Sequence, residues 1–546
     1  MLEARGRGTV SGIDPGDDAA QRGPGPLSAA VAQLCLRLGP QVGERTAAGI
    51  REVLRRLGAP LQVAVAGRIS SGKSTLVNAL IGRRVAPTDV GECTRLVTRF
   101  SYGTVDRVEV VLRDGRRRAL PFDADGMIPR DPGSRTGTEI ASISHLEAYL
   151  TNAVLRDLTV IDTPGLGSLD AASVSRTEAL LGAGSAAGAG STGGTPDTSL
   201  DEVSAAAVAG AEAVLYVVTQ AVRADDAQVL AAFTAATASR DAGPANAIAV
   251  LNKADTIPPE SVEGSGGDVW KAASLLAAKQ AAALRPRVAD VLPVIGLLAE
   301  TAETGGFTAA DAEALKALTG TDEATRTAML LSGDLFTTMD APVSEGTRMR
   351  LLERLDLHGV ERALAAIDAD HGITAGALRR VLLDSSGLPG VRGRLDAVFR
   401  ARADGIKAAA ALASVTALAR TGGDPGERQR VHEAIEVLLQ RREAHQLRLL
   451  EALTLVTSGA VRLPEDLTDE VVRVGGSHAA AEQLGMIGHG RGELAAYALE
   501  RAGWWRSFAS FGATPAQSRV AHVVHRAYFL IWQQLRDDPR GPRGRS

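Results

Sequence analysis

Residues 63–82 read "VAVAGRISSGKSTLVNALIG", and this stretch decides the fold. A short apolar run passes through two glycines into a Lys-Ser-Thr triplet, after which apolar residues return at helical spacing. A glycine-rich turn exposes backbone N–H groups, and the helix N-terminus that follows adds partial positive charge. The stretch therefore predicts a phosphate-binding loop between a buried strand and a helix.

The loop fits the G-x-x-x-x-G-K-[ST] pattern, with a strand before it and a helix after it. In this pattern the backbone wraps the β-phosphate, Lys73 reaches the β and γ oxygens, and the Ser74 hydroxyl is a magnesium ligand. The predicted nucleotide contacts of the loop are Gly67, Ser71, Gly72, Lys73, Ser74 and Thr75.

A second segment, "TVIDTPG" at residues 159–165, ends a hydrophobic strand downstream of the loop. An acidic residue in this place can hold magnesium through a water molecule, which is the role expected of Asp162. Gly165 can offer its N–H to the γ-phosphate. The sequence thus predicts a complete site for a nucleoside triphosphate and Mg²⁺.

A third segment, "AVLNKAD" at residues 249–255, predicts which base is bound. Asp255 offers two acceptor oxygens, which match the N1 and N2 donors of guanine, whereas adenine presents an acceptor at N1. Two acceptors facing each other in a buried site cost about 1–3 kcal/mol or more. GTP is therefore favoured over ATP, with Asn252 orienting the loop and the base edge and the Lys253 stem lying on the ring face.

Composition excludes several classes of protein. A length of 546 residues suits two or three domains, and 3% aromatic residues with abundant alanine favour helices packed through small side chains. The net charge of −4, without an aromatic-interleaved basic patch, argues against a nucleic-acid partner.

Cys35 and Cys93 have no CxxC spacing, which fits a reducing cytosol. His522 and His525 lack a cysteine or carboxylate at metal-ligand spacing and are expected to be ordinary helix-surface residues.

Hydrophobic periodicity predicts an α/β domain with a mostly parallel sheet, followed by an elongated all-α region. The strand "DRVEVVLRDG" is expected at an antiparallel edge, and "TGGDPG" at residues 421–426 is the expected turn of a long helical hairpin. The expected organisation is a disordered tail (1–26), a GTPase domain with two preceding helices (27–300), a flexible Gly/Ala/Ser insertion in it (about 182–199), a helical bundle or stalk (301–536) and a second disordered tail (537–546).

The three nucleotide segments, together with "GKSTLVNALIG" and "APTDVGECTRLVTRF", resemble the dynamin family of GTPases. Within that family the chain is similar to the actinobacterial members, including the isoniazid-inducible dynamin-like proteins of mycobacteria. "LPVIGLLAET" and the helical segments "RMRLLERLDLHGVERALAAI" and "SSGLPGVRGRLDAVF" also carry the likeness. The resemblance implies that Thr94 is a switch threonine contacting magnesium and the γ-phosphate, beside Ser74 and Asp162.

One departure from the family concerns catalysis. Eukaryotic dynamins place a Gln-Ser pair in the loop, where this chain has Ile69 and Ser70. Ser70 can keep its role in positioning the attacking water, but Ile69 cannot act as a polar residue. Arg68 is a candidate charge donor to the β- or γ-phosphate, with a solvated or ion-paired arginine as the open alternative. Slow basal turnover, activated by dimerisation, is expected.

Two functions remain open after GTP binding. In the first, GTP-loaded heads pair, in a homodimer or with a related dynamin-like partner, and the helical half couples this to the cytoplasmic face of a membrane. In the second, a regulatory GTPase acts on a protein partner without remodelling a membrane. No segment reaches the roughly 18 apolar residues that span a bilayer, so membrane contact would be peripheral. Two segments could touch lipid, 408–418 and 503–511, and for both we expect helix-core packing instead.

Overall fold

The computed structural model describes residues 25–88, 96–164, 211–220, 246–284, 288, 290–400, 403–421, 424–439, 444–457, 461–476 and 479–537. The predicted insertion, Cys93, Thr94, Gly165 and nearly all of both predicted tails lie outside these ranges. At the two ends of the described chain, a helix begins at Pro26 and a helix ends at Asp537.

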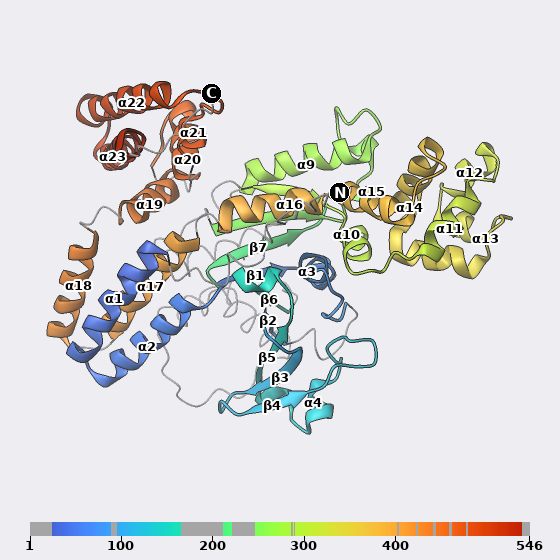
Figure 1. Cartoon of the computed structure of the whole chain (residues 1–546), viewed down its shortest axis with the longest axis horizontal. Helices are drawn as coiled ribbons and strands as arrows, with labels where there is room; N and C mark the ends of the chain where they lie inside the picture. The colour runs from blue at the N-terminus through green and yellow to red at the C-terminus, as the bar shows by residue number, and fades with distance from the viewer. Residues whose placement is uncertain are drawn as a thin grey trace, which may run out of the picture.

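A mixed sheet forms the centre of the molecule (Figure 1), in the order β4-β3-β5-β2-β6-β1-β7-β8-β9. Five of its strand pairings are parallel and three are antiparallel. The strands β1, β7 and β8 are buried along their whole length, which explains why the sequence shows them as unbroken apolar runs. The strands are β1 (Leu61–Gly67), β2 (Thr98–Tyr102), β3 (Arg107–Leu112), β4 (Arg117–Leu120), β5 (Ile143–Leu150), β6 (Leu158–Asp162), β7 (Ala213–Val218), β8 (Ala247–Asn252) and β9 (Val291–Val294).

The antiparallel part of the sheet corrects one expectation. β3 is antiparallel, as predicted, but it pairs with β4 on one side and β5 on the other, so β4 is the edge strand. The sequence analysis missed β4 because three of its four residues are exposed and it carries no apolar alternation. The turn between β3 and β4 contains Gly115, whose φ of +85° suits a tight hairpin.

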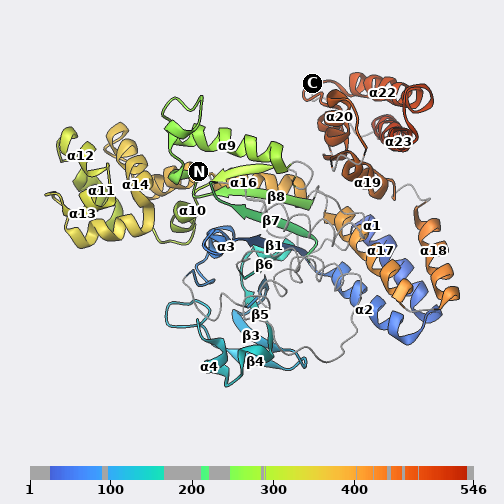
Figure 2. The same ribbon diagram turned by 180° about the vertical axis from the view of Figure 1, so that it is seen from behind.

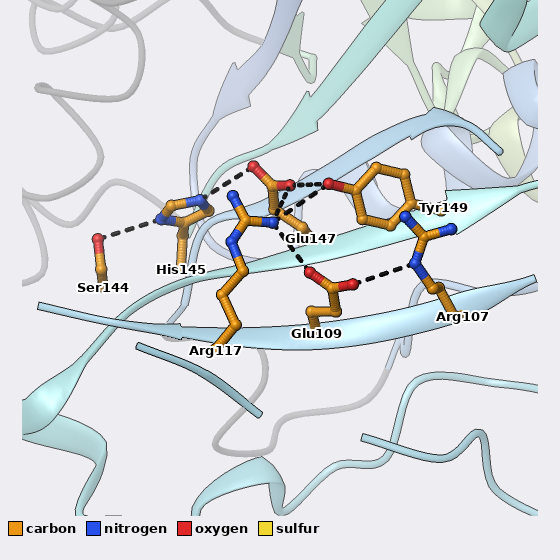
Figure 3. A network of polar contacts seen from close by, with 7 residues as sticks. All are labelled: Arg107, Glu109, Arg117, Ser144, His145, Glu147 and Tyr149. Carbon is orange, nitrogen blue, oxygen red and sulfur yellow. Dashed lines mark hydrogen bonds and ion pairs between the residues drawn. The ribbon is translucent and has the colours of Figure 1, made fainter. Parts of the chain in front are cut away.

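A polar network covers the outer face of β3, β4 and β5 (Figure 3). Arg117 donates from Nη1 to Glu109 at 2.9 Å and to Glu147 at 3.3 Å, and the Tyr149 hydroxyl donates to Glu147. The guanidinium of Arg107 lies 3.8 Å from the centre of the Tyr149 ring. Since alternate residues of these strands enter the apolar core, this network holds the three strands together on the side that faces solvent.

Helices cover both faces of the parallel part of the sheet (Figures 1 and 2). Two short helices, α4 and α5, lie beside the antiparallel part, where they contact β4 and the strands β2 and β6, respectively. The bounds are α3 (Lys73–Ile81), α4 (Pro132–Thr136), α5 (Val154–Asp157), α9 (Val269–Leu284), α10 (Gly296–Glu303) and α16 (Leu388–Leu395).

Described residues beyond β9 form helices, as predicted, but the core does not break at residue 300. Leu298 of α10 belongs to the same apolar cluster as Leu315, Phe336, Leu351 and Leu378 from the helices that follow. The apolar packing therefore joins these helices to the sheet and extends across the boundary that the sequence predicts between residues 300 and 301. They are α11 (Ala309–Leu318), α12 (Glu323–Met329), α13 (Gly333–Thr338), α14 (Glu345–Ala369) and α15 (Ala375–Ser385).

A four-helix bundle joins the two N-terminal helices to two helices from the second half of the chain. It consists of α1 (Pro26–Leu38), α2 (Glu44–Gly58), α17 (Ala403–Thr421) and α18 (Pro425–Leu439). The helical hairpin predicted around residues 421–426 is α17 and α18. Its second arm was predicted to run on past residue 450, but α18 ends at Leu439. The two N-terminal helices, which we assigned to the GTPase domain, pack on α17.

Charged side chains of α17 and α18 cap the N-terminal helices. Asp404 accepts hydrogen bonds from the backbone of Leu27 at 2.9 Å and of Ser28 at 2.8 Å, at the start of α1. Lys407 donates from Nζ to the carbonyl of Leu57 at 2.7 Å, at the end of α2. Each charge has the sign that the helix dipole favours. Of the six alanines in residues 408–418, Ala408, Ala410 and Ala411 are buried in this bundle, in agreement with the expected close packing.

The last helices form a separate apolar cluster. They are α19 (His445–Thr457), α20 (Glu465–Gly476), α21 (Ala480–Leu484), α22 (Arg491–Phe511) and α23 (Pro515–Asp537). In the segment 503–511 we expected Trp504, Phe508 and Phe511 to face the core. The structure instead buries Trp505 completely, while Phe511, at the turn between α22 and α23, is 94% exposed and Trp504 is 40% exposed.

A buried carboxylate connects α20, α22 and α23, and it generates a stability prediction. Glu470 accepts hydrogen bonds from Arg501 Nε and Trp505 Nε1, both at 2.9 Å, and from the Tyr528 hydroxyl at 2.5 Å. Glu470→Ala leaves three buried donors unpaired, so we expect the free energy of unfolding to fall by about 3–5 kcal/mol. Urea unfolding followed by tryptophan fluorescence measures the loss.

The matched control is Glu500→Ala on the exposed side of α22, for which we expect a change below about 0.5 kcal/mol. Burial raises the pKa of Glu470, but the hydrogen bonds from Arg501, Tyr528 and Trp505 outweigh it and leave the pKa below 4.5. The stabilisation is therefore complete above about pH 4.5 and is lost at lower pH, as the carboxylate takes up a proton. Equal losses in both variants would contradict the role given to Glu470.

Candidate nucleotide-binding site

The phosphate loop lies where β1 ends and α3 begins, at the carboxyl edge of the parallel strands. Two of its glycines are required by close approach. A Cβ on Gly67 would lie 2.4 Å from the carbonyl oxygen of Val217, and a Cβ on Gly72 would lie 2.3 Å from Nδ2 of Asn252. Gly72 also has φ of +87°, in the left-handed region. The loop thus keeps its backbone N–H groups free of side-chain cover.

Lys73, Ser74 and Asp162 meet at the start of α3. The Ser74 hydroxyl donates to Oδ2 of Asp162 at 2.9 Å, and Lys73 donates from Nζ to the carbonyl of Arg68 at 2.8 Å. Burial raises the pKa of Asp162 to about 6, although the charge of Lys73 and the Ser74 hydroxyl act in the opposite direction. Burial also lowers the pKa of Lys73, an effect that Asp162 opposes. The carboxylate is thus short of positive charge.

Two buried atoms in this cluster have no hydrogen-bond partner among the described residues. They are Oδ1 of Asp162 and Oγ of Ser71. A buried carboxylate oxygen without a donor is costly, and a hard divalent cation satisfies it. The donor set of carboxylate and hydroxyl oxygens is the kind that Mg²⁺ prefers, so the residues present fit that ion.

Asn252 ties the phosphate loop to the base loop. Its Nδ2 donates to the carbonyl of Ser71 at 2.8 Å, and its Oδ1 accepts from the N–H of Gly296 at 2.9 Å. A Cβ on Gly296 would lie 2.8 Å from Oδ1, so glycines on both sides make room for the amide. The predicted loop-orienting role matches this geometry. The amide forms both bonds within the protein rather than toward a base edge.

The base loop follows β8 directly. Lys253 has φ of +57° and is exposed, while Asp255 is half-buried one turn further on. Burial raises the pKa of Asp255, and the charge of Asp356 adds to this effect, while His358 and Lys253 oppose it. Both carboxylate oxygens can still accept from a purine edge. The roles of these two side chains in guanine recognition remain predictions.

A break in α14 lies beside this loop and was missed by the sequence analysis. Asp356, in the middle of the helix, has φ of +55° and ψ of 176°, a region that non-glycine residues rarely adopt. Burial lowers the pKa of His358, against the charge of Asp255. Nothing in the helical periodicity of residues 345–369 signals the break.

Arg68, Ile69 and Ser70 form the outer part of the phosphate loop. The carbonyl of Arg68 accepts from Lys73, its side chain is half-buried, and Ile69 is 64% exposed. Ser70 is exposed and has φ of +61°. The structure places both Arg68 and Ser70 at the mouth of the loop, where their catalytic roles remain predictions. Thr75 follows Ser74 in the first turn of α3.

A second asparagine organises the segment after α3. Asn78 donates from Nδ2 to the carbonyl of Ala86 at 2.9 Å and to Glu300 at 2.7 Å, and its Oδ1 accepts from the N–H groups of Val85 and Ala86 at 3.0 and 2.8 Å. All four hydrogen-bonding positions of this buried amide are occupied. They fix the backbone at Val85 and Ala86, which precede Thr94 in the sequence. The sequence carries a sign of this role, because the polar Asn78 interrupts the apolar run "TLVNALIG".

Comparison with known proteins agrees with this geometry. Residues 63–254 match the Dynamin family model. The chain is 32% identical over 467 residues to the isoniazid-induced protein IniC of Mycobacterium tuberculosis, covering 83% of this chain and 85% of that protein. Over 131 residues it is 40% identical to a bacterial dynamin-like protein of Nostoc punctiforme, covering 22% and 18% of the two chains.

A solved structure described as an oligomerised bacterial dynamin pair aligns with 94% of this chain and 75% of its own, at 12% identity and a TM-score of 0.29. The likeness to IniC extends far into the helical half, since it spans more than four fifths of this chain. On that likeness, the protein belongs to the dynamin family of GTPases.

Proposed function

We propose that this protein binds GTP with Mg²⁺ and hydrolyses it to GDP and phosphate. The observation that carries the proposal is the buried, unpartnered Oδ1 of Asp162 beside the Ser74 hydroxyl and Lys73. A magnesium ion would satisfy the unpartnered carboxylate oxygen, and the triphosphate would accept hydrogen bonds from the ammonium of Lys73.

Each residue then has a defined task. Ser74 and Asp162 would hold Mg²⁺, with Thr94 and the N–H of Gly165 as further proposed contacts. The ion, when bound, neutralises charge on the β and γ oxygens. Lys73 exchanges the carbonyl of Arg68 for phosphate oxygens. Electrostatic stabilisation by donors fixed in advance is the main source of rate enhancement in phosphoryl transfer.

Guanine recognition is assigned to Asp255, with the Lys253 stem against the ring face. Asp255 accepts from N1 and N2 of guanine, while adenine places its own acceptor at N1. Arg68 and Ser70 are proposed to act on the phosphates and on the attacking water. Eukaryotic dynamins have a polar residue at the place in the loop that Ile69 occupies here, so neither Arg68 nor Ser70 has that polar neighbour.

We further propose that GTP-loaded heads pair, as a homodimer or with a related dynamin-like partner, and that the helical half contacts the cytoplasmic face of a membrane peripherally. None of the described helices combines the length and apolar character needed to cross a bilayer. Phe511 supports a peripheral contact, because a 94% exposed aromatic at a helix turn offers apolar area to lipid.

Lys73→Ala tests the phosphate site. Removing the ammonium takes away a positive charge that no neighbour replaces, so we expect GTP turnover to fall by at least about 100-fold. Phosphate release at saturating GTP and magnesium measures the rate. Lys271→Ala, an exposed lysine of α9, is the control and should keep normal turnover; wild-type rates in the Lys73 variant would contradict the site.

Asp255→Ala tests the base assignment. Loss of the acceptor pair should weaken binding of GTP by about 5- to 150-fold, corresponding to 1–3 kcal/mol, with little effect on ATP. Titration of fluorescent GTP and ATP analogues measures both affinities. Glu260→Gln, an exposed carboxyl nearby in sequence, is the control. Equal affinity of the unmodified protein for GTP and ATP would reject guanine selectivity.

Membrane coupling is tested by liposome co-sedimentation with light scattering. A non-hydrolysable GTP analogue should increase both dimerisation and pelleting, because several weak apolar contacts act together in an oligomer. Phe511→Ala should weaken pelleting about tenfold or more, from the 1.5–3 kcal/mol of one inserted side chain. Leu331→Ala, 74% exposed in another part of the chain, is the control.

If the protein stays monomeric with the analogue and never pellets with anionic liposomes, the membrane proposal fails. The regulatory GTPase acting on a protein partner then replaces it.

A further inference from the structure

A groove of about 590 Å³ lies between α19 and α23. It is lined by Arg448 from α19 and by Arg526, His522 and His525 from α23, together with Val523, Phe529, Leu530 and Gln533. The volume lies within the range of small-molecule sites. Its two histidines are those that the sequence analysis expected to be ordinary surface residues.

The lining is cationic on one side and apolar on the other. No Asp or Glu is among the described residues that line the groove. The ring Nδ1 of His525 lies 2.7 Å from the carbonyl oxygen of Ala502, so this nitrogen is the donor and Nε2 is left for another partner. A metal is not indicated, since the described residues contain no cluster of three His, Cys, Asp or Glu side chains.

A buried histidine lies near the two arginines of the groove. His445, the first residue of α19, is only 6% exposed, and neither of its ring nitrogens has a hydrogen-bond partner. Burial lowers its pKa to about 4, and the charges of Arg526 and Arg448 lower it further in the same direction. Among the residues that the structure describes, no carboxylate offsets this effect of the two arginines on the pKa of His445.

We propose that this groove binds the phosphate headgroup of an anionic phospholipid. Arginine matches phosphate oxygens with paired donors. The apolar side of the groove, formed by Phe529, Leu530 and Val523, suits the part of a lipid next to its headgroup. Charge complementarity selects an anion, and the apolar side selects a lipid over a free phosphate. This inference rests on the proposed membrane contact and names its ligand.

The test compares Arg448→Gln/Arg526→Gln with Arg506→Gln/Arg519→Gln, a control pair of exposed arginines on α22 and α23 outside the groove. Both variants change the net charge equally. Each is mixed with phosphatidylcholine vesicles, with and without phosphatidylglycerol. We expect the groove variant to bind the anionic vesicles about 30-fold more weakly, from about 1 kcal/mol for each arginine, and the control to lose less than about threefold.

A footprinting measurement on the unmodified protein does not depend on how the variants fold. Short-chain phosphatidylglycerol should protect His522 and His525 from diethyl pyrocarbonate, with exposed His432 of α18 as the control. Glycerol phosphate, the headgroup without acyl chains, should protect less. Equal protection by glycerol phosphate would assign the groove to a soluble phosphate compound and overturn the lipid assignment.

The outcomes separate this inference from the function on which it rests. If the unmodified protein binds no vesicles, both fail. If it binds anionic vesicles and the groove variant binds equally well, the groove assignment is overturned and membrane contact stands. Equal losses in both arginine pairs would indicate a diffuse field rather than a site. A change of oligomeric state in the groove variant, with lipid binding intact, would make the groove a contact between copies.

Discussion

The amide of Asn252 is the constraint on which the nucleotide site depends. One side chain bonds the carbonyl of Ser71 in the phosphate loop and the N–H of Gly296 at the start of α10. The amide fits only because Gly72 and Gly296 carry no Cβ. Three separate segments of the chain are thereby held in one arrangement before any nucleotide arrives. This buried polar contact therefore stabilises the phosphate loop and the base loop together.

The same contact extends into the helical part of the chain. α10 begins at Gly296 and packs on α14, where the Thr301 hydroxyl donates to the carbonyl of Arg354 at 2.6 Å. Two residues later α14 breaks at Asp356, in a backbone region that costs about 1–3 kcal/mol for a non-glycine residue. Such strain persists only where the surroundings impose it. Here the break brings Asp356 and His358 close enough to influence the charge of Asp255, the residue assigned to guanine.

The buried parallel strands and the phosphate loop could be predicted, because there sequence pattern and structure share one physical cause. Fully buried parallel strands such as β1 and β8 require apolar runs, and a phosphate loop requires glycine, so both leave clear patterns. The edge strand β4 could not be predicted, because Arg117 and its neighbours follow no alternation and the strand depends on partners brought by β3 and β5. The break at Asp356 and the approach of His358 arise from tertiary packing, which no local pattern encodes. The burial of Trp505 instead of Trp504 depends on the rotation of α22 against α23. The two tryptophans are adjacent, so a rotation of the helix by one residue position would exchange them.

The packing of the chain ends explains how a head and a helical half form one mechanical unit. α2 ends at Gly58 and β1 begins at Leu61, so the strand that carries the phosphate loop is joined almost directly to the four-helix bundle. Lys407 of α17 donates to the carbonyl of Leu57 at this junction. A shift of β1 along its axis must therefore move α2, or break a charge-assisted hydrogen bond and the apolar contacts of α2 with α17. Because packed interfaces resist continuous deformation, these contacts link the position of the strand to that of α2. The domain boundary predicted at residue 300 assigns α1 and α2 to the GTPase domain and α17 to the helical part, yet the structure packs these helices together through contacts between residues more than three hundred positions apart.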